Sequence, residues 1–374
     1  MKHMSCILDA GEFRYMLGKA LNGAAKRSRI PVLEEALFRF DGYFWTITCT
    51  NLELWCQAIT RCDDEPCAFV LTDSRKLLTA CKYFSGDMVL TYTEDDPPKT
   101  CPTKTALDGT LTLSCGGKEL RQRVTAAEDF PVMPEVKAEH GYDIDPDALS
   151  KRFERIKYAL SSNTSRPSYC CVKFFDDRIG AVDGYRLAVS RDGDLRVEKP
   201  FLIPPSAMKL LPLFEGVESR LSVGEKYVVI DSGYTRVMAR MPEGDSLDFD
   251  KAIPTICKEE HPVDISDFMD NLRYLSQFIR FPSKEYVRFD CGVLSVDTAK
   301  GSYSAKPRLT EIPATVCGFN GGYMMDALQQ FQAKRLDTVT MRMNGNSVAP
   351  IIMSDGEDLA MVLPMRLKDQ SKAA

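Results

Sequence analysis

Residues 182–187 read Val-Asp-Gly-Tyr-Arg-Leu and lie near the middle of a chain of 374 residues. An apolar run, 179–182, enters Asp183-Gly184, a dipeptide that strongly favours a two-residue turn. A second apolar run follows Arg186. The stretch therefore predicts a β-turn in a buried sheet. A second interpretation makes residues 185–187 the rim of a groove that takes an apolar peptide, and the rest of the chain must decide between them.

Outward from this stretch, the same kind of helix start occurs three times. Asp9 is followed by Glu12 as in a capping box, Asp145 precedes Pro146, a favoured first helical residue, and Asp264 opens the third start. Apolar residues then recur at intervals of three or four, which predicts amphipathic helices. These residues are Phe13, Leu17 and Leu21; Leu149, Phe153, Ile156 and Leu160; and Phe268, Leu272, Leu275 and Ile279.

A hairpin, a strand, a second helix and further strands follow each start, so one unit is repeated three times. This order predicts an α+β fold of three tandem similar domains, each with two helices and a mostly antiparallel sheet. We expect the domains at residues 1–135, 136–257 and 258–374. Antiparallel sheets with free edges can pair edge to edge, which favours an arc or a ring. The predicted hairpins are 38–42, 172–176 and 287–290, and the predicted second helices are 73–78, 205–211 and 321–328.

The composition is that of an ordinary globular protein, with 44% hydrophobic and 27% charged residues. The thirteen cysteines are odd in number and scattered, which favours reduced thiols in the cytoplasm over a disulfide framework. Residues 1–5 are followed by no apolar leader, and no run approaches the length of a membrane span. No zinc spacing, nucleophile motif or nucleotide-binding glycine pattern occurs, so we expect no metal, no cofactor and no catalytic residue.

Basic residues gather on the predicted helices and next to them, whereas acidic pairs such as those at Asp63, Asp95 and Asp176 fall in turn-like contexts. A charged solvent face is the ordinary explanation for any one helix. Because all the helices tend to be basic in a chain of net charge −5, we expect a segregated surface that follows a phosphate backbone. The candidate DNA contacts are Arg14, Lys19, Arg27, Arg75, Lys151, Arg152, Arg155 and Arg166.

Six short stretches, in order along almost the whole chain, resemble motifs of one family, the bacterial sliding clamp, which is the beta subunit of DNA polymerase III. The resemblance implies a ring-forming DNA-clamp fold that catalyses no reaction. It also implies a head-to-tail homodimer around double-stranded DNA, bound without sequence preference. The expected partners are the polymerase III catalytic subunit, the clamp loader and other clamp-binding proteins, and we expect a nucleoid-associated cytoplasmic protein. The stretches are 27–33, 48–53, 127–131, 181–188, 318–323 and 362–367.

By the same resemblance, partner peptides would bind in a pocket between the second and third domains, and Leu120, Phe278 and Ile279 would lie at the dimer interface. The chain departs from the family at Leu247, where a proline is usual, at Cys171, where a glycine is usual, and in an extension, 368–374. The predicted pocket residues are Val182, Gly184, Tyr185, Arg186, Leu187, Leu247, Ala252, Asn320, Tyr323, Ala349, Met361, Leu363, Pro364, Met365 and Arg366.

Two other functions stay open at this point. The first is a divergent clamp-fold module that binds peptides and is not loaded on DNA. The second is a hydrolase that uses the acidic pairs. A processivity clamp is the leading hypothesis, because it alone accounts for the repeat, the basic helices and the six stretches together.

Overall fold

The computed structural model describes residues 3–62, 65–94, 109–191, 193, 195–244, 247–281 and 285–367. It divides into two compact units, residues 1–149 with 206–241 and residues 150–205 with 242–374. The acidic pairs that begin at Asp63 and Asp95, and the C-terminal extension, lie outside the described residues. Over the described part of the chain, none of the helices has the length and apolarity that crossing a membrane requires.

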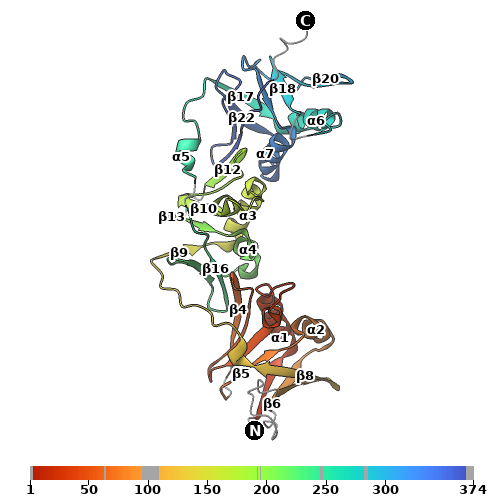
Figure 1. Ribbon diagram of the computed structural model, residues 1–374, viewed down its shortest axis with the longest axis vertical. Helices are drawn as coiled ribbons and strands as arrows, with labels where there is room; N and C mark the ends of the chain where they lie inside the picture. Colours follow the sequence, from red (N-terminus) through yellow and green to blue (C-terminus); the bar gives the residue numbers. More distant parts are fainter. Residues whose placement is uncertain are drawn as a thin grey trace. The chain divides into compact units, whose positions relative to one another are not determined.

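The order of elements repeats three times: a strand, a helix, four strands, a helix and three strands (Figure 1). The first copy comprises β1 (His3–Asp9), α1 (Ala10–Ala20), β2 (Ala36–Phe40), β3 (Phe44–Thr50), β4 (Leu54–Arg61), β5 (Cys67–Leu71), α2 (Ser74–Ala80), β6 (Asp87–Glu94), β7 (Gly109–Cys115) and β8 (Lys118–Ala126). The second comprises β9 (His140–Ile144), α3 (Pro146–Ile156), β10 (Val172–Asp176), β11 (Arg178–Val182), β12 (Arg186–Arg191), β13 (Val197–Ile203), α4 (Pro205–Met208), β14 (Ser219–Val223), β15 (Tyr227–Asp231) and β16 (Thr235–Arg240). After the short helix α5 (Phe249–Ala252), the third comprises β17 (Glu259–Asp264), α6 (Ile265–Ser276), β18 (Val287–Asp290), β19 (Val293–Thr298), β20 (Gly301–Ala305), β21 (Cys317–Phe319), α7 (Gly321–Ala333), β22 (Thr338–Met343), β23 (Ile351–Ser354) and β24 (Asp358–Val362).

The predicted α+β fold with antiparallel sheets is confirmed, while the domain boundaries stay a prediction. The strand that opens each copy was not predicted. These strands are β1, β9 and β17, and each pairs with the first strand after the second helix of its own copy. The helix expected at 205–211 is shorter than predicted, because α4 ends at Met208 and a separate turn of 3-10 helix spans Leu211–Phe214.

The three predicted helix starts are all capped by an aspartate. The carboxylate of Asp9 accepts a hydrogen bond from the backbone N–H of Glu12 at 2.9 Å. Asp145 accepts one from the N–H of Asp147, and Asp264 one from the N–H of Asp267, each at 2.9 Å. Each cap satisfies a backbone donor that the first helical turn leaves unpaired. The same local chemistry therefore begins the first helix of every copy.

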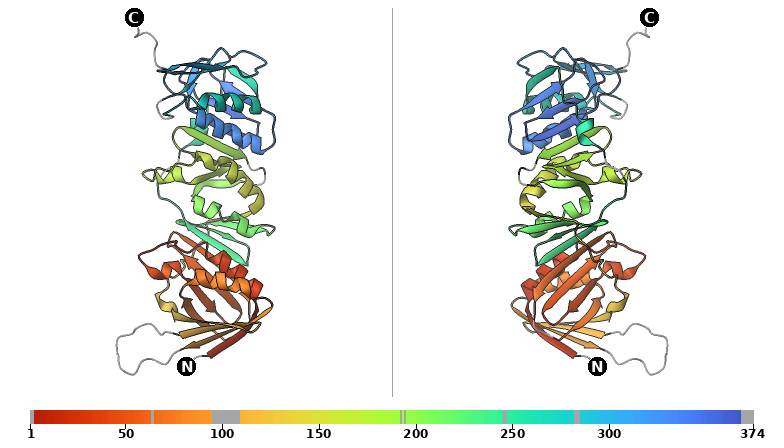
Figure 2. Two further views of the ribbon diagram at one scale, coloured as in Figure 1. Left: turned by 90° about the vertical axis from the view of Figure 1, so that its right-hand side faces the viewer. Right: turned by 90° about the vertical axis from the view of Figure 1, so that its left-hand side faces the viewer.

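Pairing between strands of different copies builds the large sheets. In the first unit, a 12-stranded sheet runs in the order β1-β6-β7-β8-β5-β2-β3-β4-β16-β15-β14-β9. The second unit has an 8-stranded sheet, β13-β10-β11-β12-β24-β23-β22-β17, and a 4-stranded sheet, β20-β19-β18-β21. The pair β4–β16 joins the first copy to the second, and β12–β24 joins the second to the third. Within the first unit α1 and α2 lie side by side, as do α6 and α7 within the second (Figure 2).

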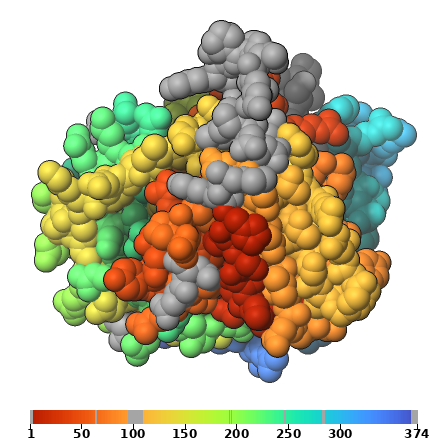
Figure 3. All heavy atoms as spheres, turned by 90° about the horizontal axis from the view of Figure 1, so that it is seen from below, coloured from red at the N-terminus to blue at the C-terminus, as the bar shows by residue number. Residues whose placement is uncertain are grey.

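Some strand edges have no partner strand among the described residues. β1 pairs only with β6, and Figure 3 shows it in dark red at the surface of the first unit. β8 pairs with β7 along its length but with β5 only through residues 124–126, so residues 118–122 have a partner strand on one side only among the described residues. In the second unit, β20 pairs only with β19. Such edges can add a strand from another chain.

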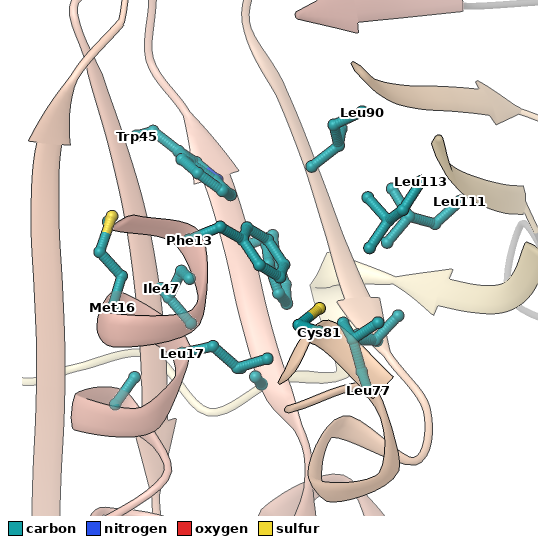
Figure 4. Close-up of a cluster of buried hydrophobic side chains, with 14 of the residues drawn as sticks. Phe13, Met16, Leu17, Trp45, Ile47, Leu77, Cys81, Leu90, Leu111 and Leu113 are labelled. Carbon is teal, nitrogen blue, oxygen red and sulfur yellow. The ribbon is translucent and has the colours of Figure 1, made fainter. Parts of the chain in front are cut away.

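The core of the first unit is built on stacked aromatic rings beneath α1 (Figure 4). The ring of Phe13 lies 5.4 Å from that of Trp45 and 6.0 Å from that of Phe38, measured between centroids, and the ring of Phe40 stacks on that of Trp45. Phe13 and Trp45 are completely buried. Because α1 contributes Phe13 at the centre of this stack, the helix is fixed on the sheet by that one side chain more than by any cap.

Replacing Phe13 by alanine should therefore destabilise the first unit by about 3–5 kcal/mol, since the surrounding rings cannot close the cavity. Urea unfolding followed by circular dichroism and tryptophan fluorescence measures this effect. Tyr15, on the exposed face of the same helix, is the matched control, and its replacement by alanine should change stability by about 0.5 kcal/mol or less. Equal effects of the two substitutions would contradict this account of the core.

Candidate functional site: a groove beside the 182–187 turn

The turn within residues 182–187 joins β11 to β12, as predicted. The carboxylate of Asp183 accepts hydrogen bonds from the backbone N–H groups of Tyr185 at 2.8 Å and Arg186 at 2.9 Å. Gly184 has a φ of 93°, a conformation that glycine adopts without a steric cost. The two predicted interpretations are therefore compatible, because this tight turn also presents Tyr185 to solvent with 63% of its surface exposed.

The equivalent turn of the first copy has the same backbone design and different side chains. Asn51 accepts hydrogen bonds from the N–H groups of Glu53 at 3.0 Å and Leu54 at 2.8 Å, and Leu52 has a φ of 75°. The corresponding position after Leu52 holds Glu53, not an aromatic residue. The fold thus supplies the turn in both copies, and the side chains of 185–187 distinguish the middle copy.

Arg186 connects this turn to α7. Its Nε donates to Asp183 at 2.9 Å, and its Nη1 forms an ion pair with Asp326. The guanidinium also lies 4.4 Å from the ring centroid of Tyr323 and 5.3 Å from that of Tyr158. Burial opposes the charge, but the hydrogen bonds to Asp326 and Asp183 outweigh it and raise the pKa of Arg186. The side chain is consequently a fixed wall of the site and not a mobile surface cation.

A cavity of about 530 Å³ opens against this turn. Its lining is mainly polar, and exposed Arg166 lies over the ring of Tyr169 at 5.5 Å. Burial, followed by the nearby carboxylate of Asp183, raises the pKa of Tyr323, so its hydroxyl stays protonated at neutral pH. The lining residues are Leu160, Ser161, Ser162, Asn163, Arg166, Tyr169, Asp183, Gly184, Tyr185, Arg186 and Tyr323.

An apolar cluster lies on the other side of the same turn. Val182 and Leu187, which flank the turn, both belong to it, and Tyr169 belongs to the cluster and to the polar cavity. We call the cavity and the exposed edge of this cluster the groove. The buried members of the cluster are Phe175, Val182, Leu187, Val189, Phe249, Ile352 and Met361, and the partly buried ones are Tyr169, Leu247, Ala252, Ile253, Cys257 and Leu359.

The C-terminal strand of the third copy lies next to the turn and adds Met361 to the apolar cluster. Leu187 is paired with Met361 in the β12–β24 ladder, and the N–H of Leu363 donates to the carbonyl of Tyr185 at 2.9 Å. The N–H of Met365 donates to the carbonyl of Gly318 at 2.7 Å. Leu363 is therefore held next to the turn and Met365 next to β21, while the pocket roles of Pro364 and Arg366 stay predictions.

Two predicted pocket residues have roles of another kind. The side chain of Asn320 caps α7, accepting from the N–H groups of Gly322 at 2.9 Å and Tyr323 at 3.2 Å. It therefore positions Tyr323 at the groove. Ala349 lies in a turn capped by Asn346 and does not belong to the apolar cluster of the described residues.

Several groove residues were not predicted from the sequence. Phe175 lies on β10, whose alternating pattern indicates a strand without showing which apolar side chain faces a groove. Phe249 lies in α5, a helix of one turn that Asp248 caps by accepting from the N–H of Lys251 at 3.2 Å. Tyr169 lies in one turn of 3-10 helix, Pro167–Cys170, and Asn163 lies in the loop before it, where no periodic pattern identifies them.

The predicted DNA contacts are not all equally available. Arg14, Arg27, Arg75, Lys151 and Arg166 are exposed, and Arg152 is half-buried. Lys19 donates to the hydroxyl of Thr235 at 3.0 Å. Arg155 lies 2.8 Å from the buried carboxylate of Asp358 and donates to Ser190 at 3.1 Å. The positive charge of Arg155 is therefore compensated inside the second unit, and its contact with DNA stays a prediction.

The chemistry expected of a hydrolase or metal site has little support in the described residues. The described acidic pair, Asp176 and Asp177, forms ion pairs with Arg178 and Arg191. Within the described ranges, no group of three or more His, Cys, Asp or Glu residues is arranged to hold a metal ion. The groove is consequently the most developed candidate site.

Comparison with known proteins gives a consistent result, although no family model matches the chain. The beta sliding clamp of Chlamydia trachomatis is 21% identical and the match covers 98% of this chain and 88% of that protein. That of Haemophilus influenzae is 24% identical over 62% of each chain. Among solved structures, the Caulobacter crescentus beta sliding clamp matches with a TM-score of 0.81, 18% identity and coverage of 98% and 99%. The Pseudomonas aeruginosa DNA polymerase III subunit beta matches with a TM-score of 0.82, 17% identity and coverage of 97% and 100%. Sequence relatives and fold neighbours agree, and the predicted resemblance to the bacterial DNA polymerase III beta subunit, the sliding clamp, is confirmed.

Proposed function

We propose that this chain is a DNA sliding clamp, a head-to-tail homodimeric ring that encircles duplex DNA in the bacterial cytoplasm. It would tether the replicative polymerase and exchange it for the clamp loader and other partners. The observation that carries the proposal is the threefold repeat of elements. Its first copy has an edge on β8, and its third an edge on β20, without a partner strand among the described residues. Such a ring catalyses no reaction, because it acts by keeping a tethered enzyme at high effective concentration.

Ring closure would join the free edge of β8 in one protomer to that of β20 in its partner. Leu120 lies in the unpaired part of β8 and packs partly on the core. Phe278 stacks on Tyr303 of β20, with ring centroids 3.6 Å apart and planes 7° apart. Ile279 packs against the core of the third copy. The predicted interface residues therefore lie in β8 or beside β20, which supports strand pairing between two copies.

DNA would be held by the exposed basic side chains on and next to the helices. Arg14 on α1, Arg75 on α2 and Lys151 on α3 are exposed, and Arg27 follows α1. Lysine and arginine bind phosphates with the release of counterions whatever the base sequence, which suits a clamp that slides.

The groove would take a partner peptide. Its apolar cluster can bury one or two hydrophobic anchors, each contributing about 1.5–3 kcal/mol, and the polar cavity beyond Tyr169 can accept hydrogen-bonding groups. Polymerase, clamp loader and repair proteins would then compete for one site. Leu247 and Ala252 pack partly buried against the apolar cluster and would form a wall of the groove, so the preferred peptide would differ from that of clamps with a proline at the first of these positions.

Light scattering on the purified chain should give about twice the protomer mass of 41.9 kDa. Replacing Leu120 by aspartate places a charge at the proposed strand pairing and should shift the mass to that of one protomer. Ile7, exposed on the other edge strand β1, is the control, and its replacement by aspartate should leave the dimer intact. A stable wild-type monomer at micromolar concentration would refute the closed ring.

Reversing the charges of Arg27 and Lys151 to glutamate should abolish stimulation of the host polymerase on primed circular DNA, because both are proposed to face the phosphates. The control is glutamate at Lys199, an exposed residue on strand β13, which should retain stimulation. If the double variant stimulates synthesis normally, DNA does not thread these helices. A third outcome is that neither the wild-type chain nor the double variant stimulates synthesis. If the double variant is then still dimeric and still binds the partner peptide, the chain is better described as a peptide-binding module that is not loaded on DNA.

Replacing Gly184 by alanine should strain the turn, because a side chain at a φ of 93° costs about 1–2 kcal/mol. If the free turn relaxes to relieve this strain, binding must restore the original conformation, and partner-peptide affinity should fall by up to roughly 5- to 30-fold. Gly193, which has no positive φ and no neighbour within 4 Å of an added β-carbon, provides the matched control. Isothermal titration with a peptide from the C-terminal region of the host polymerase measures both, and equal affinities would contradict a role of this turn in binding.

A further inference from the structure

Lys173 is a lysine on an interior strand with only 8% of its surface exposed. It lies on β10, and its Nζ donates a hydrogen bond of 2.6 Å to the backbone carbonyl of Leu247, 74 residues further along the chain. The same ammonium lies 5.5 Å from the ring centroids of both Phe175 and Phe249. A buried cation is stable only where acceptors compensate its desolvation. Here the acceptor is the backbone carbonyl oxygen of Leu247, which belongs to the proposed wall of the groove.

The segment that receives this hydrogen bond has little structure of its own. α5 is a single helical turn, and one turn is not stable by itself. Phe249 is 2% exposed, and its ring lies 5.1 Å from that of Phe175. Arg178 of β11 donates to the carboxylate of Asp250 at 2.7 and 3.1 Å. Two basic side chains of the sheet therefore hold this segment. Lys173 binds the backbone carbonyl of Leu247, and Arg178 binds the carboxylate of Asp250.

The backbone of β11 is shaped to receive the same segment. A β-carbon added at Gly180 would lie 2.5 Å from Cε1 of Phe249, so the ring occupies the place of a side chain. Gly180 is also the register partner of Lys173 in the β10–β11 pair. The Phe249 ring therefore lies against Gly180, and the Lys173 ammonium lies near the same ring. The ammonium also donates to the Leu247 carbonyl.

We infer that Lys173 is a positioning residue of the groove, whose ammonium fixes the backbone at Leu247 so that Leu247 and Ala252 form a wall before a peptide arrives. The inference rests on the proposed peptide-binding function. A preformed wall spares the peptide the entropic cost of ordering the segment. Without Lys173, the apolar cluster would remain, but its outer wall would have to be ordered in each binding event.

The charges around Lys173 give this role a dependence on pH. Burial lowers the pKa of Lys173 from the ordinary value of 10.5, and Arg178 acts in the same direction, whereas Asp248, Asp250 and Asp176 oppose the shift. Below the lowered pKa, the ammonium holds the carbonyl with a charge-assisted hydrogen bond, and above it a weaker neutral one remains. Peptide affinity should therefore fall as the pH rises through this pKa. The free energy of unfolding should instead rise with pH between the lowered pKa and the ordinary value of 10.5. The folded state disfavours the charged lysine, and deprotonation removes that cost.

The test uses the full chain and a fluorescent peptide from the C-terminal region of the host polymerase III catalytic subunit, with binding followed by anisotropy. Replacing Lys173 by methionine should weaken binding about tenfold, the usual effect of losing a hydrogen bond to a charged group. The matched control is methionine at Lys251, which removes a like charge from the segment that Lys173 holds but is exposed. Its affinity should stay within about twofold of wild type.

A purely structural lysine would not give the expected pH profile. Wild-type affinity should decline as the pH rises through the lowered pKa of Lys173, below the ordinary value of 10.5, whereas that of K173M should be flat over the same range. If K173M fails to fold, Lys173→Arg decides the matter, because arginine keeps the charge and a donor for the Leu247 carbonyl but does not lose its proton in this pH range, so its affinity should not decline with pH.

The outcomes separate the two levels of the proposal. Equal affinities of wild type and K173M with identical pH profiles would overturn the positioning role and leave the groove as a peptide site. Where K173M does not fold, a K173R affinity that declines with pH as in wild type would overturn it as well. A wild-type chain that does not bind the peptide at any pH would overturn the peptide-binding function, and the positioning role with it.

Discussion

The groove depends on one set of backbone hydrogen bonds, those that pair β12 with β24. This pairing places Leu187 opposite Met361 and Arg186 opposite Val362, so residues from the second and third copies share one surface. The backbone hydrogen bond from Leu363 to Tyr185 extends the ladder past the end of β24. Every side chain of the groove is positioned relative to this joint, because a shift of one residue would turn the apolar side chains to the other face of the sheet.

The same joint occurs between the first two copies without producing the same site. There β16 pairs with β4, and the turn before β4 carries Leu52 and Glu53 in place of Gly184 and Tyr185. The backbone conformation is retained, with a positive φ in both turns. A repeated fold therefore supplied several equivalent positions, and only one acquired the aromatic residue, the doubly paired arginine and the apolar cluster.

Local features were the ones that the sequence predicted well. Helix caps at Asp9, Asp145 and Asp264 and turns such as Asp183-Gly184 depend on residues within a few positions, so their chemistry is visible in the sequence. The opening strands β1, β9 and β17 were missed, and β9 and β17 contain few apolar residues that would mark a strand. Tyr169, Phe249 and Lys173 could not be found by pattern, since their neighbours are distant in the chain. The family resemblance proposed the other pocket residues, and their binding role stays a prediction.

The contact between Gly180 and Phe249 also limits how this site can change over generations. A side chain at 180 cannot be accommodated while the aromatic ring lies against the strand, since the β-carbon would overlap the ring. Substitution at 180 becomes tolerable only after 249 has lost its ring, and that first step would loosen the segment that carries Leu247. The order of the two mutations therefore matters, and lineages that share this groove wall should exchange both residues together or neither.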